Sequence, residues 1–460
     1  MAEPESDRQF HILMFPWFCS GHITPFFYLS NKLAERGFTI SLLLPNKASK
    51  QFRYLNANPH RITLHPLHIP HVNGLPFGVE TVSEISLNLT PLLSIALDRT
   101  RDQVEILINN IQPDFVIYDL AHWIPQITKP LGIKAIHYTV VCVASVSIVL
   151  VPARNIIKNE LLQEEKLVEP PAGYPSSTLV LRGHEVRALL FVGEPFGESI
   201  TFYERICTSM KESDALAIRT FPEIESKFCD YLGDQYGKPV LLTGPLLSEH
   251  KEELEDQWSY WLSAFEDESV IFCEFGMQIN LELDQFQELL LGLELTGLPF
   301  LVALKPPIGA STVEEGMPEG FRDRVSGVGM VWGGWIEQKT ILEHPSIGCY
   351  ISHGGFGAIW EGLMSKCQLV MVPELGDQIL NTRLLVEELK VGVEVKRDIT
   401  GWYSKEHLCS VVKSVMDRDS EIGLMVKQNH SMWREMLEAH GFINACIDKF
   451  VQDIKALYTS

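Results

Sequence analysis

The chain has few basic residues for its length. Lys and Arg total 38 against 59 Asp and Glu in 460 residues, which gives a formal net charge of −21. Because such a surface repels phosphate backbones and anionic lipid, we do not expect nucleic acid or an anionic membrane as a partner. An anionic ligand would have to be attracted locally, by helix N-termini and polar side chains.

Cysteine pairs and long apolar runs are also missing. The nine cysteines are scattered without a CxxC pair, which is typical of reduced thiols in a cytosolic protein. The N-terminus, MAEPESDRQ, lacks the basic and apolar regions of a secretory signal. The most apolar run, residues 140–152, is shorter than the about 20 residues that span a bilayer. We therefore expect a soluble, cytoplasmic protein, and we expect it to act as a monomer.

Short apolar runs alternate with helical stretches along most of the chain. Runs suited to buried parallel strands are residues 10–15, 39–44, 62–67, 114–118, 133–137, 215–219, 239–242, 270–275, 300–304, 347–352, 368–372 and 391–395. This alternation predicts an α/β fold with doubly wound parallel sheets, and the length predicts two domains of about 200 residues.

The predicted domain boundary is the charged run LLSEHKEELED. It divides the chain into a first domain at 1–245, a linker at 246–256 and a second domain at 257–435. Two segments lack periodicity: residues 152–193 are predicted as lid or acceptor-pocket loops, and STVEEGMPEG as a flexible loop.

One candidate site pairs a histidine with a carboxylate. His22 follows the first strand, before a helix predicted to begin at Pro25 with Thr24 as its N-cap, and Asp119 follows strand 114–118. Carboxyl ends of parallel strands meet at one edge of a sheet. A histidine there can remove a proton from a hydroxyl while a carboxylate fixes its tautomer. From the residues alone, His22 as a loop residue and Asp119 as a helix cap remains an equal alternative.

A second candidate site lies between residues 335 and 378. Trp335 offers an aromatic face for a nucleobase, and Glu361 offers oxygens for two ribose hydroxyls. A strand ends on His353, followed by a glycine-rich turn and a helix whose first N–H groups suit a diphosphate. Asp377 and Gln378 suit sugar hydroxyls. A glycine-rich turn alone is weak evidence, but the ordered set indicates a nucleotide-sugar site.

The segment resembles the 44-residue signature box of plant UDP-sugar-dependent glycosyltransferases of family 1, without insertion. The motifs GHITPF and YDLAHW resemble the two that carry the family's catalytic histidine and aspartate. The resemblance implies the GT-B fold, in which two doubly wound Rossmann-like domains face a central cleft. The acceptor would bind mainly to the first domain and the UDP-sugar to the second, with the C-terminal helix at 436–460 packing back on the first.

The resemblance also assigns residues to roles. His22 would deprotonate the acceptor in an inverting transfer, assisted by Asp119, with no metal and no cofactor because the UDP-sugar is a co-substrate. The acceptor pocket would include His122 and Trp123. The residues expected to bind the donor are Gly21, Gly276, Met277, Trp335, Ile336, Gln338, His353, Gly355, Phe356, Gly357, Ala358, Glu361, Asp377 and Gln378.

The chain departs from the family pattern at the diphosphate. Where the box commonly reads His-Cys-Gly-Trp-Asn-Ser, this chain has His-Gly-Gly-Phe-Gly-Ala at residues 353–358, and Met277 replaces a usual serine. Fewer side chains can therefore donate to phosphate, and backbone N–H groups must contribute more.

The acceptor class comes from a narrower resemblance. WGGW, DLAHW, PAGYPSS and GLELTGLPF resemble a plant subgroup that adds a sugar to a sugar already attached to a flavonoid or terpenoid. Members of the family whose box ends in Gln often use UDP-glucose, and relatives in this subgroup also use UDP-xylose or UDP-rhamnose, so Gln378 leaves the donor open, with UDP-glucose as the first choice. Alternatives are transfer directly to an aglycone and a weakly active UDP-sugar-binding homologue.

Other chemistries are less favoured. A nicotinamide-dependent oxidoreductase would need a glycine fingerprint that PWFCSGH lacks. A zinc site at His65, His68 and His71 lacks converging ligands, and Asp417 to Asp419 is better explained as a solvated turn than as a metal-binding DxD.

Overall fold

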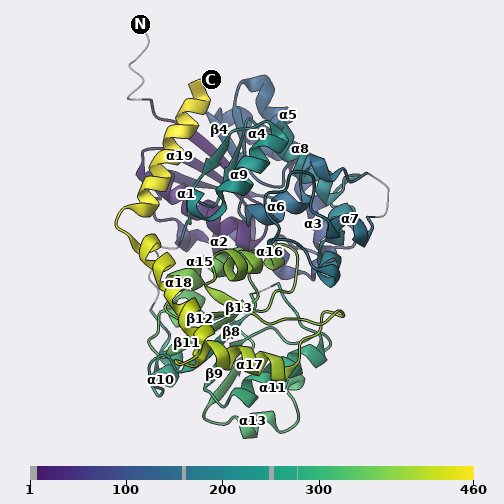
Figure 1. Cartoon of the computed structure of the whole chain (residues 1–460). Coiled ribbons are helices and arrows are strands. Elements are labelled where there is room, and N and C mark those ends of the chain that lie inside the picture. Colours follow the sequence, from purple (N-terminus) through teal and green to yellow (C-terminus); the bar gives the residue numbers. More distant parts are fainter. Residues whose placement is uncertain (1–7, 158–161, 248–252, 277, 460) are drawn as a thin grey trace. The chain divides into compact units, whose positions relative to one another are not determined.

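A computed structural model describes residues 8–157, 162–247, 253–276 and 278–459 (Figure 1). Met277 and the central part of the predicted linker lie outside the described residues. The chain folds into two compact units, each with its own core. Unit 1 comprises Met1–Pro175, Leu190–Ser248 and Ile443–Ser460, and unit 2 comprises Ser176–Leu189 and Glu249–Phe442.

Unit 1 is built on a parallel seven-stranded sheet with the order β3-β2-β1-β4-β5-β6-β7. The order reverses between β1 and β4, which makes their carboxyl ends the switch point where doubly wound sheets bind ligands. The strands are β1 (His11–Phe15), β2 (Thr39–Pro45), β3 (Ile62–Leu67), β4 (Phe115–Tyr118), β5 (Lys134–Thr139), β6 (Ala215–Ile218) and β7 (Val240–Leu242). The helices are α1 (Ser20–Glu35), α2 (Asn46–Gln51), α3 (Thr90–Asp98), α4 (Arg101–Ile111), α5 (Ile124–Thr128), α6 (Val143–Val149), α7 (Glu164–Val168), α8 (Phe202–Glu212), α9 (Pro222–Tyr236) and α19 (Phe442–Thr459).

Unit 2 repeats this plan with six parallel strands in the order β10-β9-β8-β11-β12-β13. The strands are β8 (Val270–Glu274), β9 (Phe300–Ala303), β10 (Gly329–Trp332), β11 (Ile347–Ser352), β12 (Gln368–Met371) and β13 (Gly392–Glu394). The helices are α10 (Asp256–Leu262), α11 (Leu283–Thr296), α12 (Val313–Gly316), α13 (Phe321–Arg324), α14 (Gln338–Leu342), α15 (Phe356–Met364), α16 (Gln378–Arg383), α17 (Lys405–Met416) and α18 (Glu421–Glu438). The predicted parallel, doubly wound sheets are thus confirmed in both units.

The last helix packs into the core of unit 1. Ile447, Phe450 and Ile454 of α19, yellow in Figure 1, are fully buried against apolar residues of the β1 and β2 region. Arg36 at the end of α1 donates to Asp448 at 2.5 Å. Because the three apolar side chains recur about every three to four residues, they form the buried face of an amphipathic helix.

Three local features differ from the sequence predictions. Strand β10 was not predicted, and STVEEGMPEG contains helix α12, capped by Thr312, which accepts a hydrogen bond from Glu315 N. Helix α1 begins at Ser20 rather than Pro25, with Cys19 as N-cap and Pro25 inside it. Pro25 has no N–H to donate to the Gly21 carbonyl, so the helix lacks one of its internal hydrogen bonds at this point.

Residues Ser176–Leu189, grouped with the first domain in the sequence analysis, belong to unit 2. Fully buried Arg383 in α16 forms ion pairs with Glu185 of this segment and with Glu394 of β13. Arg182 also contacts Glu394, at 3.4 Å. The segment is therefore held to unit 2 by the buried ion pairs of Arg383.

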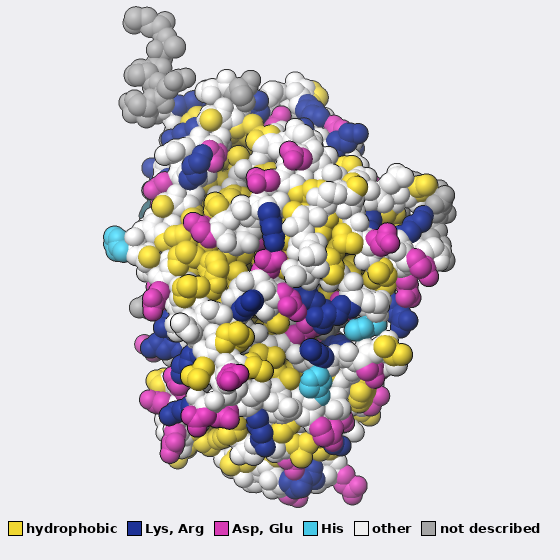
Figure 2. Space-filling view, in the orientation of Figure 1, with side chains coloured by type: hydrophobic (Ala, Val, Ile, Leu, Met, Phe, Trp, Pro, Cys, Tyr) yellow, Lys and Arg dark blue, Asp and Glu magenta, His cyan; other side chains and the backbone are white. Residues whose placement is uncertain are grey.

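The distribution of charged side chains, the cysteines and the helices can be compared with the expectations from composition. On the face in Figure 2, Lys and Arg are interspersed with Asp and Glu instead of forming one basic patch. All nine cysteines lie in the described ranges, and none forms a disulfide. No helix of the described residues combines the length and apolarity needed to cross a bilayer.

Candidate active site

The first candidate site lies where β1 and β4 end side by side. His22 lies in the first turn of α1, next to Gly21, and its Nδ1 is 2.7 Å from Asp119 Oδ2. Asp119 is buried, whereas a quarter of the His22 side chain is exposed. Because a carboxylate only accepts hydrogen bonds, Nδ1 carries the proton and Nε2 is left with a lone pair. The two predicted residues are thus brought together, and Asp119 fixes the orientation of the imidazole.

Two polar residues that sequence reasoning missed lie behind Asp119. Ser209 of α8 donates to the Asp119 carbonyl at 3.2 Å, and His137 Nδ1 is 2.8 Å from the Ser209 hydroxyl. Burial lowers the pKa of His137 to about 4, so this imidazole is neutral at neutral pH. The buried pair fixes the backbone that carries the carboxylate. Neither residue stands near the dyad motifs in the sequence, so no local signal marks them.

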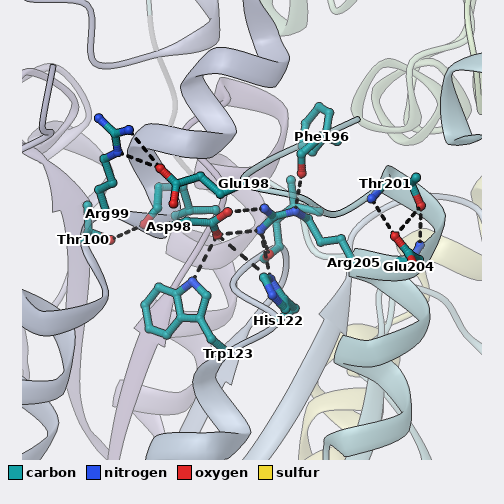
Figure 3. A network of polar contacts seen from close by, with 12 residues as sticks. Asp98, Arg99, Thr100, His122, Trp123, Phe196, Glu198, Thr201, Glu204 and Arg205 are labelled. Atoms are coloured by element: carbon teal, nitrogen blue, oxygen red, sulfur yellow. Dashed lines mark hydrogen bonds and ion pairs between the residues drawn. The ribbon is translucent and has the colours of Figure 1, made fainter. Parts of the chain in front are cut away.

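A second network holds the loop after Asp119 (Figure 3). Fully buried Arg205 binds both carboxylate oxygens of Asp98, at 2.9 and 2.6 Å, and donates to the Leu120 carbonyl at 2.9 Å. Trp123 Nε1 donates to Asp98 at 3.2 Å, and His122 Nδ1 lies 3.2 Å from Arg205. Burial and Arg205 lower the pKa of His122 to about 4. The assignment of His122 and Trp123 to the acceptor pocket stays a prediction.

In unit 2, a pocket opens at the carboxyl ends of β8 and β9. Trp335 is 63% exposed, and its indole N–H donates to Glu337 at 2.8 Å, while the neighbouring Ile336 is buried. The indole is therefore fixed at its edge while its face remains accessible for stacking. The residues lining the pocket are Glu274, Gly276, Ala303, Leu304, Lys305, Gly333, Gly334, Trp335, Ile336 and Gln338.

The predicted ribose residues contact each other. Gln338 at the start of α14 donates from Nε2 to Glu361 Oε2 of α15 at 2.6 Å. This bond fixes the amide orientation and aims one carboxylate oxygen, so Gln338 and Glu361 form one polar unit beside the pocket that Gln338 lines.

The glycine-rich turn connects β11 to the N-terminus of α15. His353 is partly buried, and burial of its ring lowers its pKa to about 4, opposed by a hydrogen bond to the Glu274 backbone. At Gly355, the N-cap, a Cβ would lie 2.5 Å from His353 Nε2, so a larger residue would displace the imidazole. Buried Phe356 packs on Trp360. The neutral imidazole thus lies beside the N-terminus of α15, whose free N–H groups suit an anion.

Gly357 and Ala358 occupy the first turn of α15, where the family commonly has Asn and Ser. A Cβ at Gly357 would meet no atom within 4 Å. The departure therefore leaves open space, and backbone N–H groups remain as the donors at this position.

The predicted sugar-binding pair is organised by its own loop. Gln378 Oε1 accepts from Glu374 N at 3.1 Å and Leu375 N at 2.9 Å, which fixes the amide orientation and leaves its NH₂ group to act as a donor. Fully buried Asn381, which sequence reasoning missed, donates to Asp377 Oδ2 at 2.8 Å and to the Gly354 carbonyl at 2.9 Å. Asn381 therefore ties the loop that carries Asp377 and Gln378 to the glycine-rich turn at Gly354.

The alternative metal sites find no support in the contacts. His65 Nε2 lies 3.0 Å from the Ser41 hydroxyl, and Asp417 accepts from the Asp419 N–H within a turn. In the ranges that the structure describes, no group of three or more His, Cys, Asp or Glu side chains could hold a metal ion.

Comparisons with known proteins agree with this geometry. Residues 327–428 match the family model described as "UDP-glucoronosyl and UDP-glucosyl transferase". The chain is 51% identical over 451 residues to UDP-glycosyltransferase 79B6 of Arabidopsis thaliana, covering 98% of each chain. It is also 51% identical over 456 residues to the anthocyanidin 3-O-glucoside 2'''-O-xylosyltransferase of the same plant, covering 98% of this chain and 97% of the relative.

Solved structures share the fold. UGT89C1 of Arabidopsis thaliana superposes with a TM-score of 0.76 at 23% identity, covering 97% of this chain and 100% of that one. TcCGT1 in complex with UDP superposes with a TM-score of 0.79 at 20% identity, covering 98% and 100%. These similarities confirm the GT-B fold class. With about half of all residues identical to curated relatives over nearly the whole length, the chain belongs to the plant family 1 UDP-glycosyltransferases.

Proposed function

We propose that this enzyme transfers a sugar from a UDP-sugar to a hydroxyl of a sugar already attached to a flavonoid or terpenoid. The hydrogen-bonded His22–Asp119 pair, in a chain of this family, carries the proposal. Family membership rules out the oxidoreductase alternative. UDP-glucose is the first choice of donor, and the name of the xylosyltransferase relative supports UDP-xylose as the main alternative, ahead of UDP-rhamnose.

The proposed reaction is a single displacement. His22 Nε2 removes the proton of the acceptor hydroxyl, whose oxygen attacks the anomeric carbon as UDP leaves. Asp119 holds the imidazole and stabilises its charged form. The charge on the leaving diphosphate is met by the N–H groups of α15 and by His353, which is neutral and can donate one hydrogen bond. The proposal is metal-independent, and Met277 lies outside the described residues.

Glu361 tests the donor part of the proposal. We expect Glu361→Gln to raise the Kd of UDP about 10- to 100-fold, because a charged acceptor of ribose hydroxyls is lost, worth about 1.5–3 kcal/mol. Isothermal titration with UDP measures this. Glu343→Gln, which neutralises an exposed carboxylate in the same signature box, is the control and should bind as the wild type does. Equal affinity in the two variants would contradict the assignment of Glu361.

Paired acceptors test the proposed acceptor class and donor sugar. A flavonoid and its 3-O-glucoside are incubated separately with enzyme and UDP-glucose, UDP-xylose or UDP-rhamnose, and the masses of the products are measured by mass spectrometry. We expect one added sugar on the glucoside only. Addition to the aglycone would replace the proposed acceptor class, and UDP binding without transfer to either would favour the weakly active homologue.

A further inference from the structure

Helix α8 presents two polar side chains to the segment that begins at Asp119. Arg205 and Ser209 are four residues apart, so they lie on the same face of the helix, and both are fully buried. Ser209 donates to the Asp119 carbonyl at 3.2 Å. Arg205 Nη1 donates to the next carbonyl, that of Leu120, at 2.9 Å. We call this pair of side chains the α8 clamp, because it holds two consecutive carbonyl groups beside the Asp119 carboxylate.

The backbone of Leu120 connects the α8 clamp to the His22–Asp119 pair. The Leu120 N–H donates to Asp119 Oδ1, which leaves Oδ2 to accept from His22 Nδ1 at 2.7 Å. This N–H belongs to the peptide group whose carbonyl Ser209 holds, and Arg205 holds the carbonyl that follows. Rotation of the peptide group would turn the N–H away from Oδ1. The α8 clamp therefore fixes the direction in which the carboxylate faces the imidazole.

Arg205 is itself held by two further segments (Figure 3). Its Nη1 and Nη2 bind the two oxygens of Asp98 at the end of α3, at 2.9 and 2.6 Å, and its Nε donates to the Phe196 carbonyl at 2.8 Å. At Gly197, a Cβ would lie 2.0 Å from Arg205 Nη2, so a side chain there would displace the guanidinium. The planar fork of an arginine can bind three partners in fixed directions, whereas the compact ammonium group of a lysine cannot make the same set of bonds.

We propose that Arg205 is a positioning residue for the proposed reaction: by holding the Leu120 carbonyl, it keeps the Asp119 carboxylate directed at His22 Nδ1. The inference rests on the proposed function, because it assumes that His22 removes the acceptor proton. Loss of the α8 clamp should slow the chemical step and leave UDP binding unchanged. Arg205 belongs to unit 1, whereas every residue proposed for the uracil, ribose and diphosphate, except Gly21, belongs to unit 2.

The experiment is a double-mutant cycle between Arg205→Lys and His22→Ala. Initial rates, with the acceptor and donor that the paired-acceptor assay selects at saturating concentrations, give kcat for the wild type, both single variants and the double variant. We expect Arg205→Lys to lower kcat about 10- to 100-fold when His22 is present. In the His22→Ala background we expect a loss of less than about twofold, because a residue that acts only through the imidazole has no effect once the imidazole is gone. The Kd of UDP should be the same in all four proteins.

The matched control is Arg99→Lys, which makes the same substitution at a neighbouring ion pair of unit 1 (Figure 3). Arg99 contacts Glu198 at 2.9 Å, and the two side chains are 46% and 56% exposed. Because this pair lies outside the α8 clamp and is largely in solvent, Arg99→Lys should retain the wild-type kcat.

Ser209→Ala tests the other half of the α8 clamp. It removes one hydroxyl group and therefore changes the packing less than Arg205→Lys does, so it keeps the inference testable if Arg205→Lys does not fold. We expect Ser209→Ala to lower kcat about three- to tenfold, the effect of one hydrogen bond, and again only when His22 is present.

Two results would overturn the inference. One is a wild-type kcat in folded Arg205→Lys, or in Ser209→Ala where Arg205→Lys does not fold. The other is the same fold-loss of kcat with and without His22, which is the pattern expected from a general distortion of unit 1. If His22→Ala itself turned over as fast as the wild type, the proposed function would fail instead, so the two failures are distinguishable.

Discussion

Replacing His22 by Ala is expected to lower kcat about 10²- to 10⁴-fold while leaving the Kd of UDP unchanged. The variant loses the imidazole that Asp119 orients at 2.7 Å, and with it the base for the acceptor hydroxyl. UDP affinity should persist because every residue proposed for the uracil, ribose and diphosphate, except Gly21, belongs to unit 2. Initial rates at saturating donor and acceptor, with titration of UDP in parallel, measure both quantities.

The matched control is His60→Ala, which removes an exposed imidazole from the same unit. It should retain wild-type kcat. A His22→Ala enzyme that turns over as fast as this control would remove the proposed base from the mechanism, whereas a parallel loss of UDP binding would assign His22 to the donor site instead.

Replacing Arg383 by Met is expected to lower the free energy of unfolding of unit 2 by about 3–5 kcal/mol. The guanidinium is fully buried between Glu185 and Glu394, both themselves buried. Without it two carboxylates are left in the interior, and Arg182 provides only a longer contact to one of them. Urea unfolding measures the loss in stability. Limited digestion with trypsin measures whether Ser176–Leu189 detaches from unit 2. Arg182 and Arg187, two cleavage sites for trypsin, lie in this segment.

Arg322→Met serves as the control, since it makes the same substitution at an exposed position of unit 2. It should change stability by less than about 0.5 kcal/mol and leave the trypsin pattern unchanged. If Arg383→Met were equally benign, the ion pairs would contribute nothing to holding Ser176–Leu189 in place.

Apolar runs predicted the parallel strands well because a strand buried on both faces must be apolar throughout. Residues 347–352 are such a run, and β11 occupies this range with every residue buried. Strand β10 was missed because it is a sheet edge of four residues that begins with glycine and is nowhere fully buried. The hydrophobicity of its sequence does not differ clearly from that of the loop before it.

The polar residues of the site fall into two groups. His22, Asp119, Trp335 and Glu361 lie in motifs, so spacing and resemblance found them. Asn381 depends on a tertiary contact, because it donates to the Gly354 carbonyl, 27 positions away in the sequence. The attachment of Ser176–Leu189 to unit 2 likewise rests on partners about 200 positions away, such as Arg383. Local patterns cannot report such contacts.

The central claim is that the acceptor oxygen displaces UDP directly from the anomeric carbon. The most direct test is the anomeric configuration of the product formed from α-linked UDP-glucose, read from the proton coupling constant of the new linkage by NMR. A single displacement with His22 as base predicts a β-linked product. An α-linked product would contradict the mechanism, because retention requires either two displacements or attack from the face that UDP leaves.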